Sequence, residues 1–263
     1  MQKRHTDRKI YFNELANTSK EFYIDYVNDF ISLTEETRVL EIGCGEGGNL
    51  VPFAEKGCTV TGIDINPIQI DNAKLFFEEK GLTGTFIYSD FLSASVPTGE
   101  DEKYDLILVH DVIEHIEPEF KVSFLTHMKK FMKSNAIAFF GFPAWQMPFG
   151  GHQQICVGFV SKLPFIHLLP MSAYRWLLTK AGENSSTIEE LCSIKRSKMP
   201  VEKFEKVVKE AGLQRCKRTL WIINPHYKQK FHLIPLREII PFNLIYYIRN
   251  FYTTTAWYIL KIR

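Results

Sequence analysis

The segment Glu41-Ile42-Gly43-Cys44-Gly45-Glu46-Gly47-Gly48 places four glycines directly after an acid. Gly43 permits a tight turn, and Gly45 lets the backbone approach a ligand with no Cβ in the way. Gly47 or Gly48 allows a following helix to pack closely on a sheet. The segment is therefore predicted to hold a nucleotide-like ligand. Because Gly43, Gly45 and Gly48 also fit a dinucleotide fingerprint, the glycines alone do not identify the cofactor.

Further acids and histidines stand at the ends of the later apolar segments, where side chains that bind a ligand are expected. Asp64 ends the next apolar segment, where a carboxylate binds ribose hydroxyls in dinucleotide-binding and nucleoside-binding proteins alike. The pair Asp90-Phe91 and the run from His110 to His115 come after two later apolar segments. Histidine is the natural proton acceptor near neutral pH, so His115 and His152 are the two candidates for a general base.

Alternating strand and helix patterns would position these residues. Apolar segments predict five strands, at Arg38 to Ile42, Thr59 to Asp64, Thr85 to Tyr88, Tyr104 to Val109 and Ala136 to Phe142. Helices are predicted at Tyr11 to Leu33, Asn49 to Lys56, Pro67 to Lys80, Glu119 to Lys133 and Val201 to Ala211. This alternation predicts a doubly wound, mostly parallel α/β sheet that binds ligands at the carboxyl ends of its strands.

After Phe142 the alternation breaks. The stretch to Met199 is rich in Pro, Gly and aromatic residues, and Asn224 to Phe251 is a second irregular stretch. Both are interpreted as insertions on the sheet, the first of them a lid over its C-terminal edge.

Composition and charge exclude several classes of protein to which the chain could otherwise belong. The chain has 263 residues, 45% of them hydrophobic and 24% charged, which excludes a disordered, collagen-like or disulfide-rich protein. Residues 1–190 carry 17 basic and 26 acidic side chains, whereas residues 191–263 carry 15 basic and 4 acidic ones. The basic C-terminal part indicates an anionic partner, such as a phosphate-bearing substrate, a membrane surface or nucleic acid, or else simply solvated helix faces.

Cysteine usage and hydropathy predict the compartment. Five scattered cysteines without a CxxC pair argue for reduced thiols and against zinc, so no metal is expected. We find no signal peptide and no uninterrupted apolar run of about 18 residues. A cytoplasmic protein is predicted, with peripheral membrane contact at most.

These motifs, taken in order, resemble those of the class I S-adenosylmethionine-dependent methyltransferases, in particular the small-molecule branch. The family's first motif, ExGxGxG, is matched by Glu41 to Gly47, and Asp111 to Ile116 looks like its VLEHI stretch. The resemblance implies a Rossmann-like, seven-stranded sheet whose last strand is antiparallel. Arg218 to Ile223 and Thr254 to Ile262 would be its sixth and seventh strands.

The resemblance implies S-adenosylmethionine as the cofactor and assigns a role to each part of the first motif. Gly43, Gly45 and Gly47 would line the methionine part of the cofactor, and Glu41 would support their loop. Asp64 would bind both ribose hydroxyls.

The later motifs would hold the remaining parts of the cofactor. Asp90 would accept a hydrogen bond from the adenine amino group, Phe91 would pack on the adenine ring, and His110 would border the methionine part. The chain would then divide into an N-terminal helical segment (1–35), a cofactor-binding core (36–142), a substrate or lid insertion (143–200) and a C-terminal part with a second insertion (201–263).

The predicted chemistry is methyl transfer, which depends mainly on an aligned nucleophile and needs a base where the acceptor is a hydroxyl. His152 lies in a glycine-containing loop after the fifth predicted strand, and His115 lies in the family-like segment. Aromatic residues in both insertions would form a wall of the acceptor site, and basic residues such as Lys195, Arg215 and Arg218 would face an anionic group. Together they favour a small-molecule acceptor that is anionic or lipid-linked. O-methylation of a glycan, a quinone or a lipid-linked precursor is the favoured reaction.

Three alternatives stay open. An NAD-dependent oxidoreductase would use the same glycine spacing, although no Tyr and Lys four residues apart on a helix follow the fifth strand. A non-catalytic adaptor would have lost the first motif or the ribose acid, and both are present. A nucleic-acid methyltransferase is disfavoured because His110 to Ile113 stands where the family's amino-methylating members carry Asn-Pro-Pro-Tyr or Asp-Pro-Pro-Tyr. The oligomeric state is left open.

Overall fold

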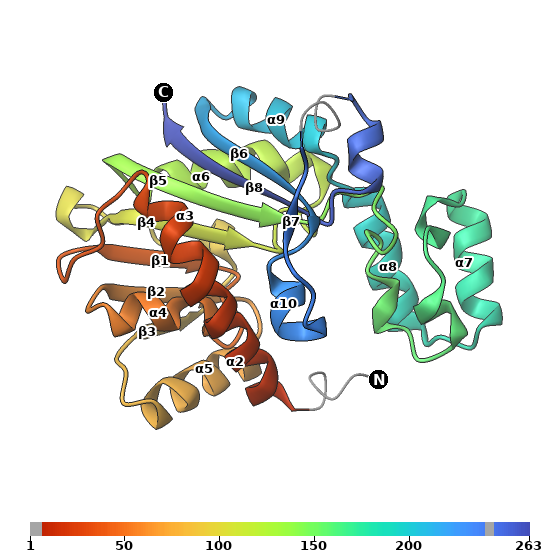
Figure 1. Cartoon of the computed structure of the whole chain (residues 1–263), viewed down its shortest axis with the longest axis horizontal. Helices are drawn as coiled ribbons and strands as arrows, with labels where there is room; N and C mark the ends of the chain where they lie inside the picture. Colours follow the sequence, from red (N-terminus) through yellow and green to blue (C-terminus); the bar gives the residue numbers. More distant parts are fainter. Residues whose placement is uncertain (1–6, 240–244) are drawn as a thin grey trace.

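Eight strands form one sheet in the computed structural model, which describes residues 7–239 and 245–263. They are β1 (Arg38–Ile42), β2 (Thr59–Asp64), β3 (Thr85–Tyr88), β4 (Tyr104–His110), β5 (Met132–Phe142), β6 (Leu213–Ile223), β7 (Leu236–Arg237) and β8 (Thr255–Ile262). Their spatial order is β3-β2-β1-β4-β5-β8-β6-β7 (Figure 1). Strands β1 to β5 are parallel, and β8 runs antiparallel between β5 and β6. The predicted doubly wound α/β class is confirmed.

The prediction of seven strands was wrong by one. The additional strand, β7, has only two residues and pairs antiparallel with β6 at the edge of the sheet. Two exposed residues show no periodicity, so a pattern search does not detect them. Strand β5 also begins four residues earlier than predicted, because Met132 pairs with Tyr104 of β4. The apolar pair Phe131 and Met132 fits a continued helix equally well.

Nine α-helices lie in the described parts of the chain, joined by turns and short 3₁₀ segments. They are α2 (Arg8–Thr18), α3 (Ile24–Asn28), α4 (Val51–Glu55), α5 (Pro67–Glu79), α6 (Lys121–Lys129), α7 (Met171–Lys180), α8 (Ser185–Ser197), α9 (Val201–Glu210) and α10 (His226–Phe231). A π-helical turn, Ser19–Tyr23, joins α2 and α3 into the predicted N-terminal helix. Residues 1–6 of the predicted N-terminal segment and residues 240–244 of the second predicted insertion lie outside the described ranges.

Helices cover both faces of the sheet. In β4, Ile107 and Val109 enter one apolar layer together with side chains of α6 and α9. Leu106 and Leu108 enter the opposite layer, which α2 to α5 complete. Figure 1 shows α2, α3 and α4 on one side of the strands and α6 and α9 on the other. Burial on both faces explains why this strand is apolar at nearly every position.

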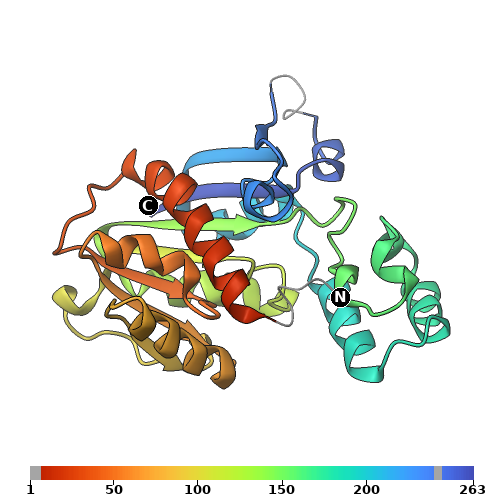
Figure 2. The ribbon, with the colours of Figure 1, turned by 60° about the horizontal axis from the view of Figure 1, so that its bottom comes forward.

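Residues 143–200 form a helical unit beyond the carboxyl ends of the parallel strands (Figures 1 and 2). This unit has its own apolar core, in which Trp145, Tyr174, Leu191 and Cys192 are buried. The irregular sequence pattern concealed two helices, although Asn184 caps α8 by accepting a hydrogen bond from the Thr187 amide at 2.8 Å. Within the described ranges, every helix is too short or too polar to cross a membrane.

Candidate active site

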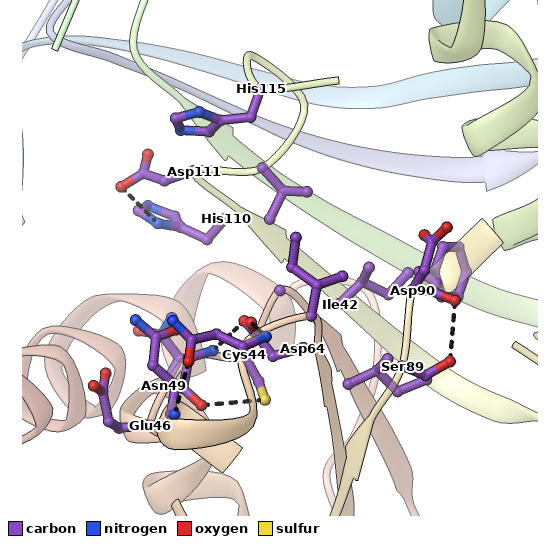
Figure 3. A pocket seen from close by; sticks show the side chains of 18 of the residues that line it. Ile42, Cys44, Glu46, Asn49, Asp64, Ser89, Asp90, His110, Asp111 and His115 are labelled. Atoms are coloured by element: carbon purple, nitrogen blue, oxygen red, sulfur yellow. Dashed lines mark hydrogen bonds and ion pairs between the residues drawn. The ribbon is translucent and has the colours of Figure 1, made fainter. Parts of the chain in front are cut away.

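A cavity of about 670 Å³ opens at the carboxyl ends of β1, β2 and β4 (Figure 3). Its volume lies in the range of small-molecule and cofactor sites. Of the residues predicted to act at the site, seven line this cavity: Gly43, Gly45, Asp64, Asp90, Phe91, His110 and His115. The other three, Glu41, Gly47 and His152, lie behind or beside its wall.

The glycine loop has left-handed backbone at three positions, with φ of 73° at Gly43, 52° at Gly45 and 77° at Gly47. A Cβ on Gly45 would meet no atom closer than 3.5 Å, because this position faces the cavity. A Cβ on Gly47 would lie 2.7 Å from the ring of Phe86. Gly45 therefore lets the backbone approach a ligand, whereas Gly47 allows the loop to pack on the sheet.

Asp64 is held at the tip of β2 by two backbone amides. Its Oδ2 accepts a hydrogen bond from the Gly45 amide at 2.8 Å, and its Oδ1 accepts one from the Asn66 amide at 2.9 Å. Each carboxylate oxygen has a further lone pair. The side chain is thus fixed in one orientation and can accept two more hydrogen bonds, as a ribose diol requires.

Glu41 is buried beneath the loop and does not reach the cavity surface. Its Oε1 accepts a hydrogen bond from the Asn49 side chain at 2.7 Å, which connects the end of β1 to the start of the following helix. Burial raises the pKa of Glu41 to about 8, with a further contribution from Asp64, although the bond from Asn49 opposes the shift. At neutral pH the buried side chain is therefore largely protonated.

At the end of the cavity predicted to hold adenine, Asp90 lies as expected but Phe91 is more deeply buried than expected. Asp90 is exposed at the cavity rim, and its Oδ1 accepts a hydrogen bond from the Leu92 amide at 3.1 Å. Phe91 lines the cavity but is only 5% exposed, since its ring packs against Phe124 and Phe131 at centroid distances of 5.3 and 5.0 Å. Phe91 is therefore part of the cavity floor, with most of its ring in the core.

His110 and Asp111 form the opposite end of the cavity (Figure 3). The Nδ1 of His110 lies 3.3 Å from Oδ2 of Asp111. Burial alone would raise the pKa of Asp111, but the adjacent His110 lowers it to about 2. Asp111 has a φ of 54°, so the chain turns sharply where β4 ends. Gly141 of β5 makes room for the histidine, because a Cβ there would lie 2.3 Å from Cδ2 of His110.

The two predicted base candidates lie side by side. The rings of His115 and His152 meet edge to face with centroids 4.9 Å apart, and the carboxylate of Glu114 lies next to both. Burial lowers the pKa of His115 to about 3, with a further contribution from His152, and burial also lowers the pKa of His152. Burial and the charge of Asp111 raise the pKa of Glu114 well above its usual value. Both imidazoles are therefore uncharged at neutral pH and have free lone pairs.

Several lining residues were not predicted. Arg8 and Tyr11 reach the cavity from α2, and Arg8 forms a bidentate pair with Glu46 at 2.6 and 2.7 Å. No local pattern places an N-terminal helix over this cavity, so the sequence held no signal for them. Glu114 was visible as the acid before His115, but nothing in the sequence indicated that it would be buried.

The aromatic and basic residues that were predicted to contact an acceptor do not line the cavity. None of the aromatic residues expected to form an acceptor wall lines the cavity; Trp145 and Tyr174, for example, belong to the core of the helical unit. Arg215 and Arg218 both pair with Glu205, and Lys217 pairs with Asp29. Much of the basic charge is therefore balanced within the chain.

Residues 39–135, which hold the glycine loop, strands β1 to β4, helices α4 to α6 and the start of β5, match the protein family described as Methyltransferase domain. These residues form a methyltransferase domain, as the resemblance to the class I S-adenosylmethionine-dependent methyltransferases predicts. The match assigns the glycine loop to a methyltransferase rather than to the alternative oxidoreductase.

Curated relatives are similar over the same region. The chain is 32% identical over 104 residues to a ubiquinone biosynthesis O-methyltransferase of Bartonella tribocorum, covering 39% of this chain and 41% of that protein. It is 27% identical over 140 residues to the protein of the same name from Histophilus somni, covering 50% and 58%. The chain thus spans about half the length of the curated relatives it matches.

Solved structures share the whole fold. A methyltransferase from Clostridium acetobutylicum superposes with a TM-score of 0.58 at 11% identity, covering 94% of this chain and 91% of that one. The magnesium protoporphyrin IX methyltransferase of Synechocystis, solved with bound SAH, gives a TM-score of 0.53 at 13% identity, covering 97% and 84%. The fold of this chain is therefore similar to that of these methyltransferases over more than nine-tenths of its length.

Proposed function

We propose that this chain transfers the methyl group of S-adenosylmethionine to an oxygen atom of a small-molecule acceptor. The observation that carries the proposal is the arrangement along one cavity, with the open glycine loop and Asp64 at one end and an uncharged imidazole, His115, at the other. S-adenosylmethionine would supply a methyl group made electrophilic by its sulfonium.

The residues of this chain fit that cofactor. Gly45 leaves room for a ligand at the backbone, and the fixed carboxylate of Asp64 has two lone pairs for the ribose hydroxyls. Asp90 stands at the rim, where it can accept from an adenine amino group. His110 and Asp111 then border the methionine part.

The acceptor would enter beyond Asp111, next to His115. Alignment of its oxygen behind the S–CH₃ bond contributes most of the rate in a reaction of this type. The uncharged imidazole of His115, which lines the cavity and has the ring of His152 beside it, can accept the hydrogen bond of an acceptor hydroxyl and so orient it. The O–C bond forms as the C–S bond breaks with its electrons moving to sulfur, and the hydroxyl proton passes to water or to an imidazole.

A quinone-type phenol is the acceptor class we favour. The curated relatives carry the name ubiquinone biosynthesis O-methyltransferase, which supports an aromatic hydroxyl. A phenol, with a pKa of about 10, also ionises far more readily than an alcohol. The alternative of a glycan has no comparable support, since the predicted aromatic wall does not line the cavity.

Exposed apolar side chains support a lipid-linked acceptor. Val157, Phe159 and Trp176 of the helical unit are 79%, 61% and 62% exposed. Phe165 of this unit lies 6.4 Å, ring to ring, from Phe251, which brings a second group of exposed side chains close. We propose that this apolar surface, formed by residues 155–176 and 245–251, contacts the membrane in which such an acceptor would reside.

Two measurements test the proposed function. Calorimetric titration with S-adenosylhomocysteine should give micromolar binding, while NADH, the control ligand, should give none. Transfer of labelled methyl from S-adenosylmethionine should then be measured with catechol and with aniline as acceptors. Methylation of catechol alone supports O-methylation, whereas methylation of aniline alone contradicts it. Binding without transfer to any phenol would favour the adaptor alternative.

A further inference from the structure

Three potential metal ligands converge beside the cavity from two different loops. Glu114 and His115 follow β4, and His152 follows β5. Oε1 of Glu114 lies 4.0 Å from Nε2 of His115 and 3.9 Å from Nε2 of His152. One donor atom from each of the three residues lies within 4.8 Å of the other two. Sequence spacing conceals this cluster, because 37 residues separate the two histidines.

The carboxylate of Glu114 is the unusual member of this cluster. Its residue is 3% exposed, yet neither carboxylate oxygen has a hydrogen-bond partner within the described part of the chain. The two imidazole nitrogens are its neighbours, but at distances too long for hydrogen bonds. A buried carboxyl group without any partner is unfavourable whether or not it is ionised, and buried carboxylates are normally paired or bound to a metal.

The backbone that carries these side chains is fixed. The ammonium of Lys121, a residue with no exposed surface, donates to the carbonyl of Ile113 at 2.6 Å. The hydroxyl of Ser197 in α8 donates to the carbonyl of His115 at 3.4 Å. On the second loop, the amide of His152 donates to the carbonyl of Phe149 at 3.0 Å. The cluster is therefore supported by its surroundings, as a binding site requires.

We propose that Glu114, His115 and His152 bind a divalent first-row transition-metal ion. Metal–nitrogen and metal–oxygen bonds of about 2.0–2.2 Å would bring tetrahedral ligand atoms to about 3.4 Å from one another. The distances of 3.9 and 4.0 Å from Glu114 thus need to shorten by roughly half an ångström, and the distance between the two imidazole nitrogens, which is at most 4.8 Å, by up to about 1.4 Å through side-chain rotation. Two imidazoles favour zinc, iron, cobalt or nickel over magnesium, which prefers oxygen ligands.

The position of the site gives the ion a role that rests on the proposed function. Since His115 lines the cavity, coordination positions left open by three protein ligands would lie beside the proposed place of the acceptor. A hydroxyl oxygen that binds there would lose its proton to water more readily, because the cation stabilises the oxyanion. The carboxylate of Asp111, on the same side of the cavity, adds negative charge next to the cation. In this arrangement the imidazoles act as ligands rather than as proton acceptors.

Metal binding can be tested without cofactor or acceptor. Untagged full-length protein, treated with chelator and dialysed, is titrated with Co²⁺ and with Zn²⁺ by calorimetry, and visible absorption of Co²⁺ reports coordination by nitrogen. We expect one ion per chain and a Co²⁺ spectrum that Zn²⁺ abolishes. Glu114→Gln and His152→Asn should each weaken binding by about tenfold or more.

A matched control is available in His232→Asn. His152 and His232 both have a φ of 57°, a conformation that asparagine tolerates, but His232 lies outside the cluster. The control should bind Co²⁺ like the unsubstituted protein, and thermal unfolding confirms that each variant is folded.

Two results would overturn the metal site. They are absence of Co²⁺ and Zn²⁺ binding by folded protein, and binding that neither cluster variant weakens. If S-adenosylhomocysteine still binds in that case, only the metal site is refuted. Metal binding without methyl transfer to any phenol would instead refute the proposed function and leave the site standing.

Discussion

His115 and His152 lie in edge-to-face contact, with ring centroids 4.9 Å apart, although each comes from a different loop of the sheet. The contact follows from the parallel pairing of β4 and β5, which brings the carboxyl ends of both strands to one edge. It places two uncharged nitrogen donors and the carboxylate of Glu114 next to a cavity that otherwise suits a nucleoside. The proposed places of donor binding and acceptor activation thus adjoin each other at one edge of the sheet.

Asp64→Ala should weaken binding of S-adenosylhomocysteine about 30- to 150-fold, because two hydrogen bonds from the ribose hydroxyls to a charged acceptor are lost. Calorimetry measures the dissociation constant. Asp71→Ala on the exposed side of α5 is the matched control, since that carboxylate is 79% exposed and does not line the cavity. An unchanged dissociation constant in a folded Asp64 variant would exclude Asp64 from the site.

Glu41→Gln should change how stability depends on pH. The pKa of Glu41 is raised to about 8 in the folded protein, so the folded state binds a proton that the unfolded chain releases above about pH 4.5. Glu41 makes its whole contribution to the free energy of unfolding below about pH 4.5, and this contribution is lost as the pH rises towards 8. Glutamine has no such proton. The variant should therefore gain about 2–4 kcal/mol relative to the unsubstituted protein between pH 5 and pH 8. Urea unfolding at both pH values measures the difference, and parallel pH profiles would contradict the expectation.

Arg8→Ala should destabilise the protein and weaken cofactor binding. The bidentate partner of Arg8, Glu46, is 1% exposed and would lose its counter-charge. Since Arg8 itself is 32% exposed, solvent screening limits the expected loss to about 1–2 kcal/mol. Lys20→Ala, which removes an exposed pair with Glu55, should cost less than about 0.5 kcal/mol. Denaturant unfolding measures the free energy of unfolding of both variants. Equal decreases would show that the pair of Arg8 and Glu46 stabilises the protein no more than an exposed pair does.

The apolar surface formed by residues 155–176 and 245–251 should bind lipid vesicles. Replacing both Phe159 and Trp176 with serine removes two large exposed side chains and should reduce co-sedimentation with phospholipid vesicles at least severalfold. Leu75→Ser on α5 removes an apolar side chain that is 49% exposed on another element, and should have no effect. Equal vesicle binding by all three proteins would refute the membrane contact.

The strand pattern could be predicted from the sequence because it depends on local periodicity. Strands β2 and β3 have the predicted bounds, since turn residues end their apolar runs sharply. The glycine loop, Asp64 and Asp90 could also be placed at the cavity, because each lies at or just after the end of a strand. Helices α7 and α8 were missed because the prolines and glycines elsewhere in residues 143–199 led the whole stretch to be interpreted as irregular, although neither helix contains a proline or a glycine.

Contacts between distant segments could not be predicted. The pair of Arg8 and Glu46 joins residues 38 positions apart, and the burial of Glu114 depends on packing of several loops. A single sequence contains no signal for such contacts. Glu114, His115 and His152 also come together only in the fold. A single sequence indicates metal ligands where they are closely spaced, as in a CxxC pair, so this site was not expected.

The close fit of His110 against Gly141 bears on how the chain reaches its native state. These residues are partners in the pairing of β4 with β5, and their neighbours in β5 are Phe140 and Phe142. A shift of the pairing by one residue would set the imidazole against a phenylalanine, where it does not fit, and would also turn each side chain of the strand to the other face. Steric overlap at His110 thus destabilises pairings of β4 and β5 that are out of register. Because His110 also borders the cavity, correct pairing of the two strands and correct formation of the cavity depend on the same contact.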